Sequence, residues 1–210
     1  PSPPVRRIVS ETGPGFPSGH TQAATVAFGY PASQLQRWRV HIVAAILVLL
    51  VALSRMYLGV HYPHDVLGGL VFGYLILFLF VKATPLLEPQ WLACSRAVRY
   101  ALALGVPLLA LAVWPLEDTA DSLGALAGFA VGGLAEAERV RFEAGGAPWQ
   151  RLLRFLVGFA GVAILYFGLK MALPEGIAWR FLRYALVGLY AAALAPWCFV
   201  RLGLARAEAA

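Results

Sequence analysis

The sequence predicts an all-α protein, a polytopic transmembrane bundle of about seven helices. Of its 210 residues, 60% are apolar and only 13% are charged, whereas charged residues make up about 25% of a soluble chain. The apolar residues also form long runs, and His41 is the only polar residue from Val40 to Leu53. Because a helix rises about 1.5 Å per residue, about 20 such residues cross a ~30 Å hydrocarbon core.

We expect the seven helices at residues 19–36, 38–57, 63–84, 90–114, 119–142, 148–173 and 177–204. Ser18 suits the capping position of the first helix, and an apolar run fills the second. Pro63 suits the first turn of the third helix, which we expect to end before Pro85. Further apolar runs support the fourth, sixth and seventh helices. In the fifth, glycines at every fourth position indicate close helix packing.

Polar residues gather in two short segments at the ends of these apolar helices. Residues 16–21 read FPSGHT, and residues 54–65 read SRMYLGVHYPHD. Each polar residue alone has a structural explanation, as a helix cap, an interfacial histidine or a snorkelling arginine. Ionisable groups inside a membrane are costly and usually mark a functional site. The joint pattern therefore favours catalysis or phosphate binding.

The histidines and the aspartate suit phosphoryl transfer through a covalent intermediate. His61 can act as the nucleophile if a partner holds its other ring nitrogen. Asp65 lies one helical turn later, so we expect its carboxylate to reach back to His61 and fix the tautomer. His20 is then left to protonate the leaving oxygen.

The remaining residues of the two segments suit phosphate binding. Arg55 offers a planar fork to phosphate oxygens. Ser18 and the backbone N–H groups of Gly19 and His20 stand at a helix start, which attracts anions. Gly19 has no side chain, so a phosphate can approach the backbone there. Since basic residues supply the positive charge, we expect neither a metal site nor a cofactor.

These segments resemble the second and third signature motifs of the type 2 phosphatidic acid phosphatase (PAP2) superfamily, PSGH and SRxxxxxHxxxD. That superfamily contains membrane lipid phosphatases and soluble haloperoxidases, and it assigns the same roles to the matching residues. Its first motif, KxxxxxxRP, is absent from this sequence. Because Pro1 resembles the proline of that motif, we expect the chain to be a fragment that lacks upstream helices.

The resemblance divides the chain into two parts. Residues 1–84 resemble the C-terminal part of the family's catalytic core, with three helices and both motifs. Residues 85–210 are an additional four-helix transmembrane region of unknown role. A dimer interface, a lipid-entry wall and a partner site are the roles left open for it, and the first would give a homo-oligomer formed through the C-terminal helices.

The positions of Lys and Arg predict the orientation. With alternating helices, one face receives eleven of the 17 basic residues, namely Arg37, Arg39, Lys82, Arg96, Arg99, Arg139, Arg141, Arg151, Arg154, Arg201 and Arg206. Basic residues gather on the cytoplasmic side of a membrane. We therefore expect an integral membrane protein, in a bacterial inner membrane, whose motifs face the periplasm or the outside of the cell.

The leading hypothesis is a metal-independent phosphatase that hydrolyses a lipid phosphomonoester or diphosphate through a phosphohistidine at the outer face. Its partners would be the lipid phosphate and the surrounding membrane lipids, with no nucleic acid. A lipid phosphotransferase with the same site is an alternative. A non-catalytic lipid-binding or transport protein with a vestigial site is another.

Several other residues receive structural interpretations. His41 lies near the predicted cytoplasmic face, and His64 occupies a variable position of the motif. Arg6 and Arg7 are interpreted as loop charge, with phosphate binding as the alternative. The two cysteines of the chain are interpreted as small apolar residues.

Overall fold

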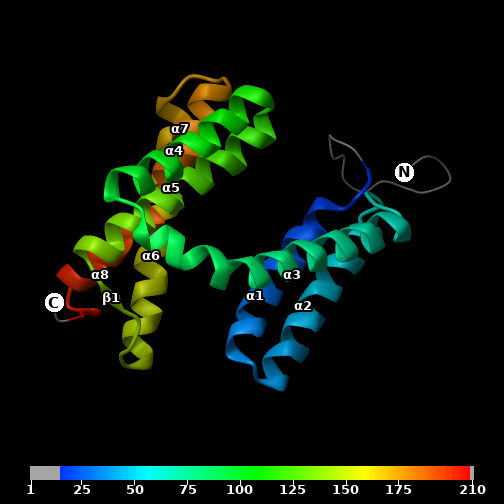
Figure 1. The fold of residues 1–210 in the computed structure, drawn as a ribbon, viewed down its shortest axis with the longest axis horizontal. Helices are drawn as coiled ribbons and strands as arrows, with labels where there is room; N and C mark the ends of the chain where they lie inside the picture. Colours follow the sequence, from blue (N-terminus) through cyan, green and yellow to red (C-terminus); the bar gives the residue numbers. More distant parts are fainter. Residues whose placement is uncertain (1–14, 209–210) are drawn as a thin grey trace. The chain divides into compact units, whose positions relative to one another are not determined.

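A computed structural model describes residues 15–208, and almost all of them are helical (Figure 1). The helices are α1 (Gly19–Leu35), α2 (Trp38–Tyr57), α3 (Pro63–Ala93), α4 (Arg96–Val113), α5 (Glu117–Arg139), α6 (Pro148–Ala172), α7 (Ile177–Leu189), η1 (Tyr190–Leu194) and α8 (Ala195–Arg201). The last three form one continuous helical run. Residues 15–208 thus contain seven continuous helical segments, the number predicted. Arg6 and Arg7 lie outside the described residues.

Five of these helices are long and apolar enough to cross a membrane: α2, α3, α4, α6 and the continuous run Ile177–Arg201. The protein is therefore a polytopic membrane bundle, as the sequence predicts. The two remaining helices have clear reasons for falling outside this group. Helix α1 has only 17 residues, and α5 carries Glu117, Asp118 and Asp121 at its start.

The chain forms two compact units, Pro1–Ala93 and Cys94–Ala210. In the first unit, α1 packs against both α2 and α3, which contact each other much less. Two glycines of α3 permit this close approach. A Cβ at Gly69 would lie 2.6 Å from the carbonyl oxygen of Ser18, and one at Gly73 would lie 2.7 Å from the Cβ of Thr25. Both positions therefore require glycine.

Helix α3 is longer than predicted, because it continues through Pro85 and Pro89 to Ala93. Each proline removes one backbone hydrogen bond. The other residues from 86 to 93 can still donate helical hydrogen bonds, so continuing to Ala93 forms more bonds than the two prolines remove. The predicted division between residues 84 and 85 thus lies inside a helix. The roles given to the two parts stay predictions.

Three other helix ends also differ from the prediction. Helix α4 begins at Arg96 instead of residue 90, because α3 extends further and Ser95 accepts a hydrogen bond from the N–H of Val98 at 3.3 Å. Helices α5 and α8 end earlier than expected. The residues beyond them form β1 (Phe142–Glu143) and β2 (Arg206–Ala207), which pair in an antiparallel ladder.

In the second unit, α5 and α7 share the largest interface. The predicted glycine stripe of α5 packs directly on α7, where a Cβ at Gly124 or Gly128 would collide with the backbone of Phe181 or Ala185. An ion cluster of Arg180, Asp121 and Glu117 joins the two helices near their N-terminal ends. The guanidinium of Arg180 in α7 donates hydrogen bonds to both carboxylate oxygens of Asp121, and its Nη1 donates to Oε2 of Glu117 at 2.7 Å.

The last helical run changes its winding before a proline. Residues Tyr190–Leu194 form a π-helix between α7 and α8, and Pro196 follows in the first turn of α8. A proline cannot donate to the preceding turn, and a π-bulge absorbs the resulting gap in the hydrogen-bond ladder. The run therefore continues to Arg201 without ending at the proline.

Gly69→Ala should destabilise the protein, because the added methyl group meets backbone atoms of α1 that cannot move aside. Such overpacking costs about 1–3 kcal/mol, more than the ~1 kcal/mol that alanine gains over glycine in a helix. Thermal unfolding of the purified protein in detergent measures the effect.

The matched control is Gly105→Ala in α4. Among the described residues, nothing lies within 4 Å of a Cβ at that position. The control should leave the unfolding midpoint unchanged or raise it. Equal midpoints for the two variants would contradict the close α1–α3 contact.

Candidate active site

The predicted site residues come together at one end of the first unit, where α1 and α3 begin and α2 ends (Figure 1). The contact between the two helix starts is a backbone hydrogen bond, in which the N–H of Ser18 donates to the carbonyl oxygen of Asp65 at 2.9 Å. This bond joins the two sequence motifs, which lie far apart in the chain.

Ser18 is the N-cap of α1. Its Oγ accepts hydrogen bonds from the backbone N–H of Thr21 at 3.5 Å and from the Thr21 hydroxyl at 3.0 Å. Ser18 and Thr21 are fully buried, which fixes the direction in which the helix begins. Ser18 thus has a clear structural task, and its predicted contact with phosphate stays a prediction.

The first turn of α1 is exposed next to this buried cap. Gly19 and His20 are both exposed. Among the described residues, no atom lies within 4 Å of a Cβ placed at Gly19. The start of a helix carries N–H groups and a partial positive charge of about half a unit. This turn therefore provides an accessible surface that attracts anions.

His61 is buried, with only 8% of its surface exposed. Its Nδ1 lies 2.9 Å from the carbonyl oxygen of Gly15. A carbonyl oxygen only accepts hydrogen bonds, so in the neutral ring Nδ1 carries the hydrogen. The lone pair then belongs to Nε2. The structure thus gives His61 the tautomer that a nucleophile at Nε2 needs.

Asp65 occupies the predicted place but makes a different contact. Its Oδ2 lies 3.7 Å from Nδ1 of His61, which is beyond hydrogen-bonding distance. The same oxygen accepts the backbone N–H of Tyr62 at 2.8 Å. Because Asp65 lies in the first turn of α3, its carboxylate caps that helix. Nδ1 of His61 therefore donates to the carbonyl oxygen of Gly15, in place of the expected hydrogen bond to the carboxylate of Asp65.

Arg55 lies in the last turn of α2 and is half-buried. Its Nε donates to the Oγ of Ser54 at 3.3 Å, and its carbonyl oxygen accepts the N–H of Val60 at 3.2 Å. Between them, Gly59 adopts a left-handed backbone with φ of 69°, which glycine tolerates without cost. This turn brings the end of α2 to the same end of the unit as His61.

His64 is the residue that the sequence interpretation missed. Its Nε2 lies 3.1 Å from Oδ1 of Asp65, although 71% of its side chain is exposed. Its ring stacks on Tyr62, with centroids 5.6 Å apart, and lies 6.5 Å from the ring of Phe16. Asp65 is thus shared between two histidines. The motif spacing gives no signal for this contact, because the position is variable.

The arrangement can bind a phosphate and receive it on a histidine. Arg55 and the start of α1 supply positive charge, and His61 presents a nitrogen lone pair. His20 lies on the exposed first turn, where a leaving group has access. Among residues 15–208, no group of three or more His, Cys, Asp or Glu side chains is placed to hold a metal ion.

Two family profiles match the chain. Residues 3–88 match the PAP2 superfamily. Residues 120–207 match the transmembrane extension of PAP2 superfamily phosphatases. The first match contains both motifs of the site, and the second covers most of the region after α4. No solved structure matches the chain significantly.

Several characterised phosphatases are similar to the chain. Phosphatidylglycerophosphatase B of Bacillus subtilis is 36% identical over 37% of this chain and 42% of its own length. Human sphingosine-1-phosphate phosphatase 2 is 32% identical over 62% of this chain and 36% of its own length. Mouse glucose-6-phosphatase 3 is 35% identical over 47% of this chain and 32% of its own length. The chain thus spans less than half the length of these relatives.

The geometry predicts the tautomers of two histidines. With ¹⁵N-labelled histidine, His61 in its neutral form should show a protonated Nδ1, because that atom faces the carbonyl oxygen of Gly15. His64 should show a protonated Nε2, because that atom faces Asp65. Nuclear magnetic resonance distinguishes the two forms, and His61→Gln and His64→Gln assign the signals. A protonated Nε2 on His61 would overturn the described geometry.

Proposed function

Because the chain belongs to the PAP2 superfamily, we propose that it is a phosphatase that hydrolyses a phosphomonoester or diphosphate of a lipid through a phosphohistidine. The observation that carries this proposal is the orientation of His61, whose Nδ1 faces the carbonyl oxygen of Gly15. Hydrolysis by this route needs a histidine with its lone pair on Nε2 beside a surface that attracts anions.

In the first step, Nε2 of His61 attacks the phosphorus, and the bond between phosphorus and the lipid oxygen breaks. His20 gives its proton to the departing oxygen. Arg55 and the N–H groups at the start of α1 bind the three equatorial oxygens, where negative charge is spread in the transition state. Ser18 holds this helix start in place through its buried contacts with Thr21, and we propose its contact with the phosphate from the motif alone.

In the second step, water attacks the phosphohistidine and returns a proton to His20. The bond between phosphorus and nitrogen breaks, and inorganic phosphate leaves. The carboxylate of Asp65 lies beside His61 and stabilises the positive ring that exists between the two steps. Since these groups supply all the charge and protons required, we propose that the reaction needs neither a metal ion nor a cofactor.

The proposed substrate is a lipid, because the helices that carry the site have broad apolar faces. Leu67, Val71 and Leu75 of α3 are exposed, and a membrane-spanning helix presents such residues to acyl chains. Phosphatidic acid, phosphatidylglycerol phosphate, a lipid A phosphate and an undecaprenyl-diphosphate-like lipid all fit a site of this kind.

The phosphohistidine can be tested with two variants and one chelator. In the presence of the chelator, the full-length protein should release phosphate from a lipid phosphate and should be inhibited by orthovanadate. His61→Gln should abolish both phosphate release and labelling of the protein by ³²P-substrate. His20→Ala should lower turnover about 100-fold or more, as expected for loss of a general acid.

The His20 variant should recover most of its activity on an aryl phosphate, whose leaving oxygen needs no proton. His41→Gln is the matched control, because His41 lies at the start of α2, at the opposite end of the helix from Arg55. Labelling of His61→Gln would contradict the assigned nucleophile. Transfer of phosphate to a lipid alcohol instead of water would make the protein a phosphotransferase.

We further propose that the site faces the periplasm or the outside of a bacterial inner membrane. In the first unit, Arg37 and Arg39 stand at the turn between α1 and α2, at the end away from the site. In the second unit, Arg139 ends α5, Arg141 follows it, and Arg151 and Arg154 lie in the first two turns of α6. Lys and Arg favour the cytoplasmic side, so the opposite ends of these helices face outward.

The two ends of α6 give a matched test of this orientation. In a background without Cys94 and Cys198, Glu175→Cys, after α6, should react with an impermeant thiol reagent in intact cells. Gly145→Cys, before α6, should react only after permeabilisation. Both positions are exposed, so accessibility within the protein does not bias the result. The reverse pattern would place the site in the cytoplasm.

A further inference from the structure

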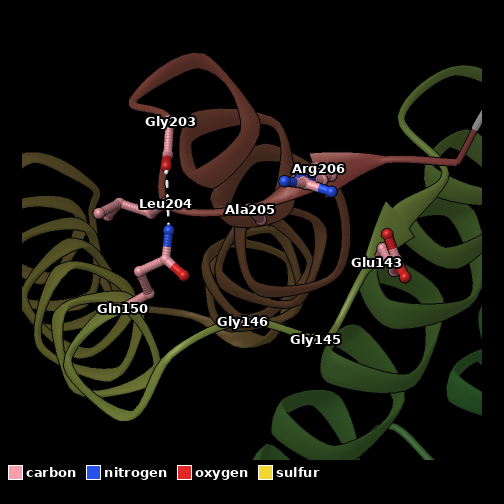
Figure 2. A pocket seen from close by; sticks show the side chains of 8 residues that line it. All are labelled: Glu143, Gly145, Gly146, Gln150, Gly203, Leu204, Ala205 and Arg206. Carbon is pink, nitrogen blue, oxygen red and sulfur yellow. Dashed lines mark hydrogen bonds between the residues drawn. The ribbon is translucent and has the colours of Figure 1, made fainter.

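A polar cavity of about 480 Å³ lies in the second unit, where α5 ends, α6 begins and α8 ends (Figure 2). Its lining residues are Glu143, Gly145, Gly146, Gln150, Gly203, Leu204, Ala205 and Arg206. Cavities of about 300–1,000 Å³ are typical of sites for small ligands. All of these residues come from the region after α5, so the cavity shares no residue with the His61 site.

The cavity has a fixed frame. The β1–β2 ladder forms one end, with Glu143 paired to Arg206 in register. At the other end, Gln150 of α6 donates to the carbonyl oxygen of Gly203 at 3.5 Å, as Figure 2 shows. Arg154 is buried and donates to the carbonyl oxygens of Ala144 and Gly145 at 3.1 and 2.7 Å. These bonds hold the loop between β1 and α6.

Two opposite charges stand at the strand end of this cavity. Glu143 and Arg206 are both exposed and lie opposite each other on the ladder. Opposite charges at such positions stabilise a ladder when they pair. Yet within the part of the chain that the structure describes, neither side chain takes part in an ion pair. A carboxylate and a guanidinium therefore remain available to a ligand.

The surroundings of the cavity indicate a lipid headgroup. Trp149 at the start of α6 and Trp197 in α8 are both exposed. Tryptophans at the ends of membrane helices lie at the level of the headgroups. Arg151 and Arg201 are also exposed at this end, and such residues attract lipid phosphates. A headgroup therefore has direct access to the cavity from the membrane surface.

We propose that this cavity binds the headgroup of a phospholipid that carries both a phosphodiester and a primary ammonium group. Arg206 binds the phosphodiester, and Glu143 binds the ammonium. A headgroup with negative charge alone would leave Glu143 facing that charge. A headgroup with both charges satisfies both side chains. The region after α4 then serves as an anchor that recognises the lipid around it, whatever reaction the His61 site performs.

Native mass spectrometry of the delipidated full-length protein tests this proposal with phosphatidylethanolamine and phosphatidylglycerol of identical acyl chains. The wild type should retain phosphatidylethanolamine about tenfold more strongly, the effect of one charge-assisted hydrogen bond. Glu143→Gln should remove this preference. Arg206→Gln should weaken retention of both lipids. The double exchange Glu143→Arg with Arg206→Glu should restore the preference, because it keeps both charges.

Two nearby substitutions are the matched controls. Glu208→Gln and Arg139→Gln remove exposed charges at the same end of the second unit, but neither residue lines the cavity. Both variants should keep the wild-type preference. Equal retention of the two lipids by the wild type would overturn the proposal, and so would equal losses in the control and cavity variants.

Soluble glycerophosphoethanolamine distinguishes the lipid from a free metabolite. It carries the same two charges without acyl chains, so it should compete only at concentrations far above those of the lipid. If it binds as tightly as the lipid does, the cavity belongs to a soluble ligand and the proposed lipid is wrong. Circular dichroism of every variant checks that the helical fold is kept.

Discussion

The close contact between α1 and α3 is the constraint on which the first unit depends. Gly69 and Gly73 let the backbone of one helix touch the other, and the N–H of Ser18 can then reach the carbonyl oxygen of Asp65. Each motif supplies only part of the chemistry. The glycines bring the anion-attracting start of α1 next to the turn that carries His61. A packing feature thus determines the geometry of a polar site.

Asp65 has more tasks than its motif indicates. Its carboxylate caps α3 through Tyr62, contacts His64 and lies near His61. A buried carboxylate is costly unless it is hydrogen-bonded, and these partners meet that need. The carboxylate is held by the capping bond and by His64. His61 therefore faces a fixed negative charge, while the carbonyl oxygen of Gly15 sets its tautomer.

The sequence predicted the helices and singled out the residues that lie at one end of the first unit. Helices and motifs could both be recognised because each depends on a local pattern of residues. Apolar runs, Ser18 and Pro63 each carry their signal in nearby residues. The predicted end of α3 and start of α4 are wrong because a proline is a local signal for a helix end, whereas α3 continues through Pro85 and Pro89 to Ala93. The contact of Gly15 with His61 uses a backbone carbonyl, which no residue type reveals. The ladder that frames the cavity joins segments about 60 residues apart in the chain and has no local pattern.

The ion cluster between α5 and α7 has a consequence for how the chain enters the membrane during synthesis. Asp121 lies in the second turn of α5, and α5 is not among the helices that are long and apolar enough to cross a membrane by themselves. Asp121 of α5 pairs with Arg180 of α7, which the ribosome synthesises about 60 residues later. The ion cluster that joins α5 to α7 can therefore form only after α7 has been synthesised.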